Sequence, residues 1–229
     1  ATGVIDTNSY AIRMDAGDSA LNSVINRGQL ISATSNGIQV TGGGYIENIA
    51  GASIDAGNNG ISLSGGVVAN NHIVNRGTVH GDSRAVTIGS VATLDNYGTL
   101  TSDSNAITAS LVGSVINNHG LIQGGAGSVI FMSQGGTIVN EATGVIRSPS
   151  LSLHTDGAMH FTNRGSLISN SNGVVIDGDG NAGNTIINSG TITGEWRLSA
   201  FNDTVTLETG STVNGPINGR AGTDSLTLD

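Results

Sequence analysis

The residues best suited to chemistry in this chain are its five histidines and its acidic residues. The histidines are His72, His80, His119, His154 and His160, and they show neither an HExxH motif nor another metal-ligand spacing. No Gly-x-Ser-x-Gly sequence is present, so the chain lacks the motif that positions the nucleophilic serine of a serine hydrolase. We therefore expect no catalytic residues, no metal site, no cofactor and no enzymatic activity.

A second candidate is the polar loop that starts at Asp177. The residues Asp177, Asp179 and Asn181 begin like a calcium-binding EF-hand loop. The position that needs glycine is Ala182, and the twelfth position is Asn188 in place of glutamate. The loop is therefore predicted to be a solvated turn whose polar side chains are candidates for contact with a partner.

The acidic residues Asp55, Asp82 and Asp103 recur in comparable turn positions, with Arg84 near Asp82. A row of carboxylates with a nearby basic residue is the arrangement expected of a polysaccharide-cleaving face. It is more often a solubilising surface that keeps sheet edges apart. A glycan-binding or glycan-cleaving face and a contact surface for another protein remain as alternatives.

A repeat along the sequence determines the secondary structure on which these residues lie. An asparagine follows a short apolar run and precedes a glycine and a further apolar residue eight times, at Asn26, Asn48, Asn75, Asn96, Asn118, Asn140, Asn163 and Asn188. The gaps are 22, 27, 21, 22, 22, 23 and 25 residues, about 23 on average. Such a period is typical of a solenoid.

Each repeat contains three short alternating stretches separated by Gly, Asp, Ser and Asn, as in "RGTVHGDSRAVTIGSVATLDN". This pattern predicts one turn of an all-β parallel β-helix, with about ten coils of 22–23 residues and three short strands per coil. Residues 1–200 are expected to form regular coils, and residues 201–229 the distal coils of the same β-helix. Trp196 interrupts the pattern and is expected to close the core.

The asparagine positions are predicted to form a hydrogen-bonded ladder at one corner. A row of amides that recognises a ligand is the alternative. The next position varies widely and is expected to face solvent. Together with the two longest coils, this position supplies the candidate binding residues, which are Arg27, Arg76, Tyr97, His119, Arg164, Asn71, His72, Asp177, Asp179 and Asn181. The recurring arginines are candidates for pairing with acidic residues of a second copy.

Composition narrows the possible partners. The formal charge is −9, so nucleic acid and anionic membranes are not expected as partners. Cysteine is absent, which excludes a disulfide framework and thiol chemistry. The sequence has no 18-residue apolar run and starts without a signal peptide.

The final stretch, "FNDTVTLETGSTVNGPINGRAGTDSLTLD", resembles the distal passenger region of bacterial type V autotransporters, the class that includes pertactin-like and self-associating adhesins. The upstream Asn-x-Gly coils are also similar to such passengers. The resemblance implies a right-handed β-helix on the surface of a Gram-negative cell. It also implies a longer parent protein, which meets the membrane only through a C-terminal barrel outside this chain.

The leading functional hypothesis is a non-catalytic surface adhesin that binds another copy of itself or a host or matrix protein or glycan. Many modest contacts along a rod sum to useful avidity between cells. One alternative is a structural stalk that presents an upstream enzyme domain, such as a subtilisin-like protease. A glycan-binding or glycan-cleaving β-helix is another.

Overall fold

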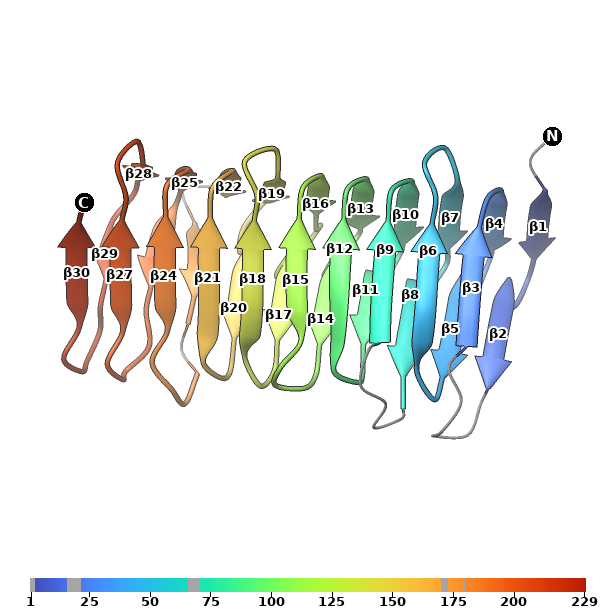
Figure 1. The fold of residues 1–229 in the computed structure, drawn as a ribbon, viewed down its shortest axis with the longest axis horizontal. Coiled ribbons are helices and arrows are strands. Elements are labelled where there is room, and N and C mark those ends of the chain that lie inside the picture. The colour runs from blue at the N-terminus through green and yellow to red at the C-terminus, as the bar shows by residue number, and fades with distance from the viewer. Residues whose placement is uncertain (1–2, 16–21, 66–70, 170–172, 179) are drawn as a thin grey trace.

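The computed structural model describes residues 3–15, 22–65, 71–169, 173–178 and 180–229. The chain winds into a rod of stacked coils, and its two ends lie at opposite ends of the rod (Figure 1). Each coil adds one strand to each of three parallel ten-stranded sheets. The predicted right-handed parallel β-helix with three strands per coil is confirmed.

The three sheets take every third strand of the chain. Sheet A contains β1 Val4–Thr7, β4 Gln29–Ser32, β7 Ser53–Ala56, β10 Thr78–Gly81, β13 Thr99–Ser102, β16 Leu121–Gln123, β19 Val145–Ser148, β22 Ser166–Ser169, β25 Thr191–Thr193 and β28 Thr212–Asn214. Sheet B contains β2 Ile12–Asp15, β5 Ile38–Thr41, β8 Asn59–Ser64, β11 Arg84–Ile88, β14 Ile107–Ala109, β17 Ile130–Met132, β20 Leu153–Thr155, β23 Val174–Asp177, β26 Glu195–Arg197 and β29 Ile217–Asn218. Sheet C contains β3 Asn22–Asn26, β6 Gly44–Asn48, β9 Asn71–Asn75, β12 Ala92–Asn96, β15 Val115–Asn118, β18 Gly136–Asn140, β21 Met159–Asn163, β24 Thr185–Asn188, β27 Thr204–Leu207 and β30 Ser225–Leu228.

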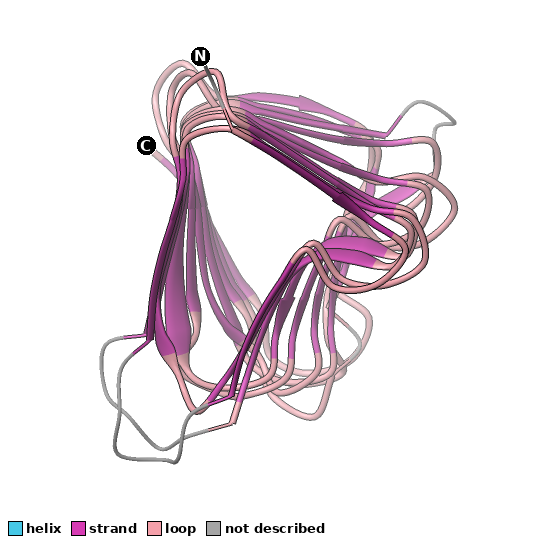
Figure 2. Ribbon diagram, turned by 90° about the vertical axis from the view of Figure 1, so that its right-hand side faces the viewer, coloured by secondary structure: helices cyan, strands magenta, loops and turns pink. Residues whose placement is uncertain are grey.

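The core is a narrow column of packed, mostly aliphatic side chains that runs the length of the rod. Figure 2 looks along the rod and shows the three sheets as the sides of its cross-section. Alternate residues of each strand point inward, and residues such as Ile73, Val79 and Ile88 are fully buried. Trp196 is also fully buried, which confirms its expected place in the core.

The asparagine ladder is confirmed by its hydrogen bonds. The eight side chains are at most 5 % exposed, and each of the first seven donates from Nδ2 to Oδ1 of the next asparagine over 2.7–2.9 Å. The same amides also donate to backbone carbonyls of the following coil, as Asn75 does to Thr99 O at 3.2 Å. The ladder is buried and fully engaged, so these amides are not available to a ligand.

A glycine beside the ladder lets the coils stack closely. Gly98 lies directly over Gly77, and a Cβ at Gly98 would fall against the carbonyl oxygen of Gly77. The Asn-x-Gly signature therefore combines a side-chain ladder with a backbone contact that only glycine permits.

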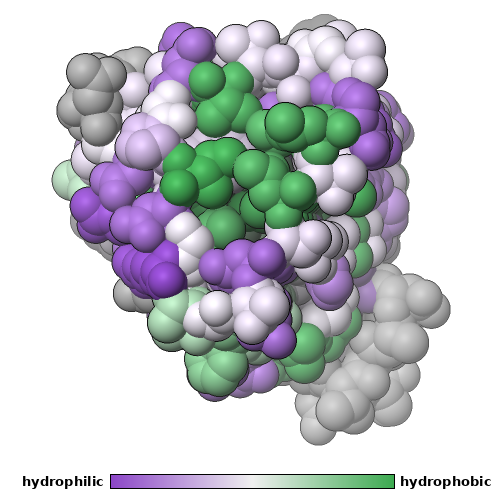
Figure 3. Space-filling model, turned by 90° about the vertical axis from the view of Figure 1, so that its left-hand side faces the viewer, coloured by the Kyte–Doolittle hydropathy of each residue, from purple (hydrophilic) through white to green (hydrophobic). Residues whose placement is uncertain are grey.

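The last coils continue the same sheets but change the corner. Asn188 pairs in register with Leu207, and Leu207 pairs with Leu228, so leucines replace the amide ladder there. The C-terminal end of the rod presents a cluster of apolar side chains (Figure 3), among which Leu226 and Leu228 are exposed. No helix that is long and apolar enough to cross a membrane occurs in the described part of the chain.

Candidate functional site

The position after each ladder asparagine forms a column along one corner, which we call the corner column. Its residues Arg76, Tyr97 and His119 stack on one another. The Arg76 guanidinium lies 4.6 Å from the centre of the Tyr97 ring, and the other face of that ring stacks on His119 at 4.6 Å. Further along, Arg164 pairs with Glu141 at 3.2 Å. These candidate binding residues contact one another, and the Tyr97 ring is covered on both faces.

The outer face of sheet C holds a second group of linked side chains. His72 contacts Asp95 over 2.7 Å, and Asp95 also accepts a hydrogen bond from Asn117 over 2.8 Å. Tyr45 packs edge-on against His72 and donates to Glu47 over 2.9 Å. The sequence identified His72 but not the acidic partner beside it, because that partner comes from the next coil.

The Glu47 carboxylate contacts two groups, the Tyr45 hydroxyl and the Arg76 guanidinium. Arg76 lies 3.4 Å from Glu47, which places an ion pair beside the Tyr45 phenol. Partial burial raises the pKa of Tyr45 above its ordinary value, and the hydrogen bond to Glu47 adds to this shift. Arg76 and Arg164 thus pair with acidic residues of the same chain, and their pairing with a second copy stays a prediction.

Two further candidate binding residues, Asn71 and Arg27, lie apart from these groups. Asn71 is 3 % exposed and binds Gly44 N, Ser90 and Val91 O, so it is a structural residue of a coil junction. Arg27 is exposed at the N-terminal end of the corner column, beside a hollow that it lines with Ile25.

Asp177 is the last residue of β23 and not the first residue of a loop, which corrects the predicted placement. Asp177 is paired with Arg220 at 3.1 Å and lies 3.8 Å from His154. Asn181 is exposed, and its backbone N–H donates to Asp156 O. Asp179 lies outside the described residues.

The acidic residues near sheet A differ from their predicted placement. Asp55 lies on the outer face of strand β7, not in a turn, and pairs in register with His80 of β10. Asp82 and Asp103 do follow their strands directly, on neighbouring coils. Arg84 donates to Thr108 at 2.9 Å on sheet B, so it is not the basic partner of this acidic group.

The outer face of sheet A carries a continuous column of side chains in register. In order along the rod, this sheet A column comprises Asp6, Ile31, Asp55, His80, Thr101, Gln123, Arg147, Ile168, Thr193 and Asn214. All ten side chains are exposed or half-buried. The column is acidic on one side of Thr101 and basic on the other.

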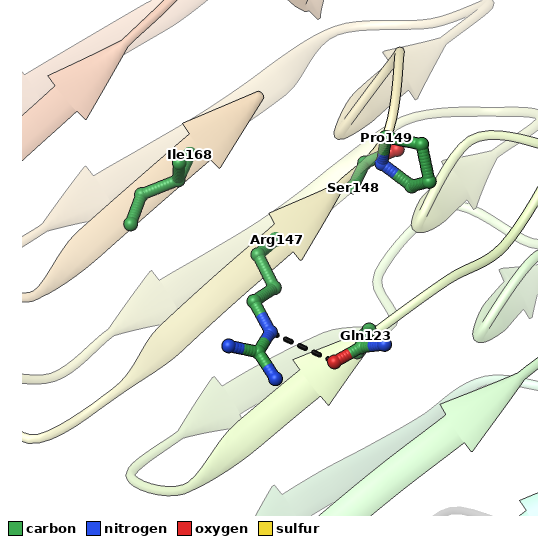
Figure 4. A pocket seen from close by; sticks show the side chains of 5 residues that line it. All are labelled: Gln123, Arg147, Ser148, Pro149 and Ile168. Atoms are coloured by element: carbon green, nitrogen blue, oxygen red, sulfur yellow. Dashed lines mark hydrogen bonds between the residues drawn. The ribbon is translucent and has the colours of Figure 1, made fainter. Parts of the chain in front are cut away.

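Arg147 lines a hollow on this face. The hollow is about 320 Å³ in volume and is lined by Gln123, Arg147, Ser148, Pro149 and Ile168 (Figure 4). Arg147 Nε donates to Gln123 Oε1 over 2.7 Å, which fixes the guanidinium. Within the described residues its two terminal nitrogens form no hydrogen bond, and one of them points away from Gln123 (Figure 4), so the guanidinium can meet a planar acceptor such as a carboxylate.

Sequence reasoning missed the sheet A column because its members are separated by 21 to 25 residues and belong to no motif. The asparagine period was the signal that could have found it. Counting from each ladder asparagine to the third residue of the next strand places Asp55, His80 and Arg147 in one row.

No family model, curated protein or solved structure matches the chain.

Proposed function

We propose that the chain is a non-catalytic adhesive rod that associates with a second copy of itself through the outer face of sheet A. The observation that carries this proposal is the order of side chains in the sheet A column. Read in both directions from Thr101, the column presents complementary groups at equal distances: Asp55 and Arg147 lie two coils away, and Ile31 and Ile168 lie three coils away.

A two-fold axis along β13 at Thr101 would bring two such faces together with their rods antiparallel. This operation keeps each residue at its position along the strand and inverts the order of coils, so the contact is isologous. Asp55 of one copy then faces Arg147 of the other twice, and the isoleucines face each other twice. Placing the axis one coil earlier would pair Asp6 with Arg147 but would set Ile31 against Gln123, so the Thr101 axis matches better.

The hollow beside Arg147 accommodates the incoming carboxylate. The hydrogen bond to Gln123 holds the guanidinium in place before binding. Charge-assisted bidentate pairs between arginine and carboxylate are among the stronger polar contacts. The flanking side chains of Ile168 and Pro149 reduce solvent access to the pair.

The size of this face predicts weak association in solution. The contact runs from Ile31 to Ile168, which is six coil spacings of about 4.8 Å. With strands about 13 Å long, it covers roughly 400 Å² of each copy's surface. This lies at the low end of specific interfaces, where contacts are transient. Dense display on two facing cells would convert many weak contacts into avidity.

The location of the rod is part of the proposal and rests on a resemblance. The passenger-like segment at residues 201–229 supports display at a Gram-negative cell surface. An antiparallel contact suits such display, because rods that project from opposite cells meet in opposite directions.

Sedimentation of the purified rod at increasing concentration tests the contact. The wild-type chain is expected to associate reversibly, and salt is expected to weaken this because the pairs are partly exposed. Asp55→Arg should abolish association, since each contact would then oppose two arginines. Glu208→Arg, the same charge change at an exposed residue away from the sheet A column, should leave association intact. Association that survives Asp55→Arg would contradict the proposal.

A further inference from the structure

A cluster of three ligand-type side chains lies where two coils leave sheet A. His80 is near the end of β10, Asp82 follows that strand, and Asp103 follows β13. Because Gly81 pairs in register with Ser102, the two aspartates occupy the same position on neighbouring coils. Like charges at such positions repel each other unless a positive group lies between them.

The separations in this cluster suit a metal ion. One ligand atom from each of the three residues lies within 4.8 Å of the other two. The His80 Nε2 to Asp82 Oδ1 distance is 3.4 Å, longer than the usual 2.7–3.2 Å of a hydrogen bond. Two ligands of a tetrahedral ion with bonds of about 2.0–2.1 Å lie roughly 3.3 Å apart.

The second nitrogen of the histidine ring is also held. His80 Nδ1 lies 3.1 Å from Thr101 Oγ1, so a hydrogen bond there orients the ring and leaves Nε2 facing the carboxylates. An outer hydrogen bond of this kind is what metal-ligating histidines use to fix their tautomer. Within the described residues, no arginine forms an ion pair with Asp82 or Asp103.

A similar His-x-Asp sequence on sheet B provides a contrast. His154 lies 3.1 Å from Asp156 and 3.8 Å from Asp177, so a second acidic residue is again nearby. There the second carboxylate, Asp177, is paired with Arg220, 3.1 Å away. One carboxylate of the sheet B group is thus already paired with an arginine, whereas neither aspartate beside His80 has such a partner among the described residues.

We propose that His80, Asp82 and Asp103 bind one Zn²⁺ ion. Imidazole nitrogen combined with carboxylate oxygen suits zinc, whereas calcium and magnesium prefer oxygen ligands alone. Water completes the coordination from the open side. This inference does not depend on self-association, because a single rod supplies all three ligands.

Titration calorimetry with zinc chloride on the 229-residue chain, at a concentration where it is monomeric, tests the site. The expected result is saturable binding of one ion per chain, weakened at least tenfold by Asp103→Asn and by His80→Gln. Asp156→Asn, which alters the sheet B group, should bind zinc like the wild type. Circular dichroism of each variant checks that the β-helix is retained.

Three results would overturn the zinc site. They are the absence of saturable one-to-one binding, wild-type affinity in a folded Asp103→Asn variant, and calcium binding as tight as zinc binding. Self-association of the same preparations is measured separately by sedimentation, so failure of one proposal is distinguishable from failure of the other.

Discussion

Single residues on the outside of this rod act mainly through the residue one coil away. Arg76, Tyr97 and His119 form a stack, and His72 is paired with Asp95. Each of these side chains was identifiable from the sequence as polar or aromatic and solvent-facing. Its partner was not, because a partner 21 to 23 residues away becomes a neighbour only once the coil register is known. The same reason hid the complementarity of Asp55 and Arg147.

The Tyr45 phenol gives a test at this scale. Partial burial and Glu47 raise its pKa, so the folded rod favours the neutral phenol. The stabilising contribution of this group is present below the unfolded pKa of about 10 and is lost as pH rises through the folded value. Absorbance titration of tyrosinate should therefore show a late-ionising group that disappears in Tyr45→Phe. Identical alkaline titration curves, apart from one fewer normal tyrosine, would contradict this.

At the scale of the element, the corner ladder does most to set the coil register. Seven consecutive hydrogen bonds between asparagine side chains link eight coils, and adjacent glycines permit the close stacking. The sequence was sufficient to predict this ladder because the same residue recurs at a nearly constant interval. It was also sufficient to predict the three strands per coil, since their alternation is local. The predicted turn position of Asp55 was wrong because the strand β7 extends one residue beyond it, and the local sequence does not fix a strand end to a single residue.

Replacing an internal ladder residue tests this role. Asn118→Ala removes bonds to Asn96, Asn140 and Val145 O and leaves buried polar groups without partners. With a cost of about 1–3 kcal/mol for an orphaned buried group, we expect a loss of roughly 2–4 kcal/mol in the free energy of unfolding. Urea denaturation followed by circular dichroism measures it.

Asn188→Leu is the matched control for that measurement. Asn188 ends the ladder and already stacks on Leu207, so a leucine there continues an existing apolar column. It breaks one ladder bond, to Asn163, and should cost less than half as much as the internal change. Equal losses for both variants would mean that the ladder does not act as a chain of mutually dependent bonds.

At the scale of the whole molecule, three flat sheets present three different surfaces. Sheet C and the corner column carry side chains that are paired within the rod, and sheet B carries the ion pairs around Asp177 of β23. Sheet A differs because its outer column matches an inverted copy of itself. The regular coil spacing makes this match possible, since equal steps along one rod meet equal steps along the other.

Mixing two charge-reversed variants tests whether Asp55 of one rod meets Arg147 of another. Beads coated with Asp55→Arg alone carry two arginines per contact, and beads coated with Arg147→Asp alone carry two aspartates. Neither population should aggregate by itself, because like charges then face each other. Mixed together, the two populations should co-aggregate, since every contact again joins an arginine to an aspartate. Aggregation of either population alone, or no aggregation on mixing, would contradict a contact between Asp55 and Arg147.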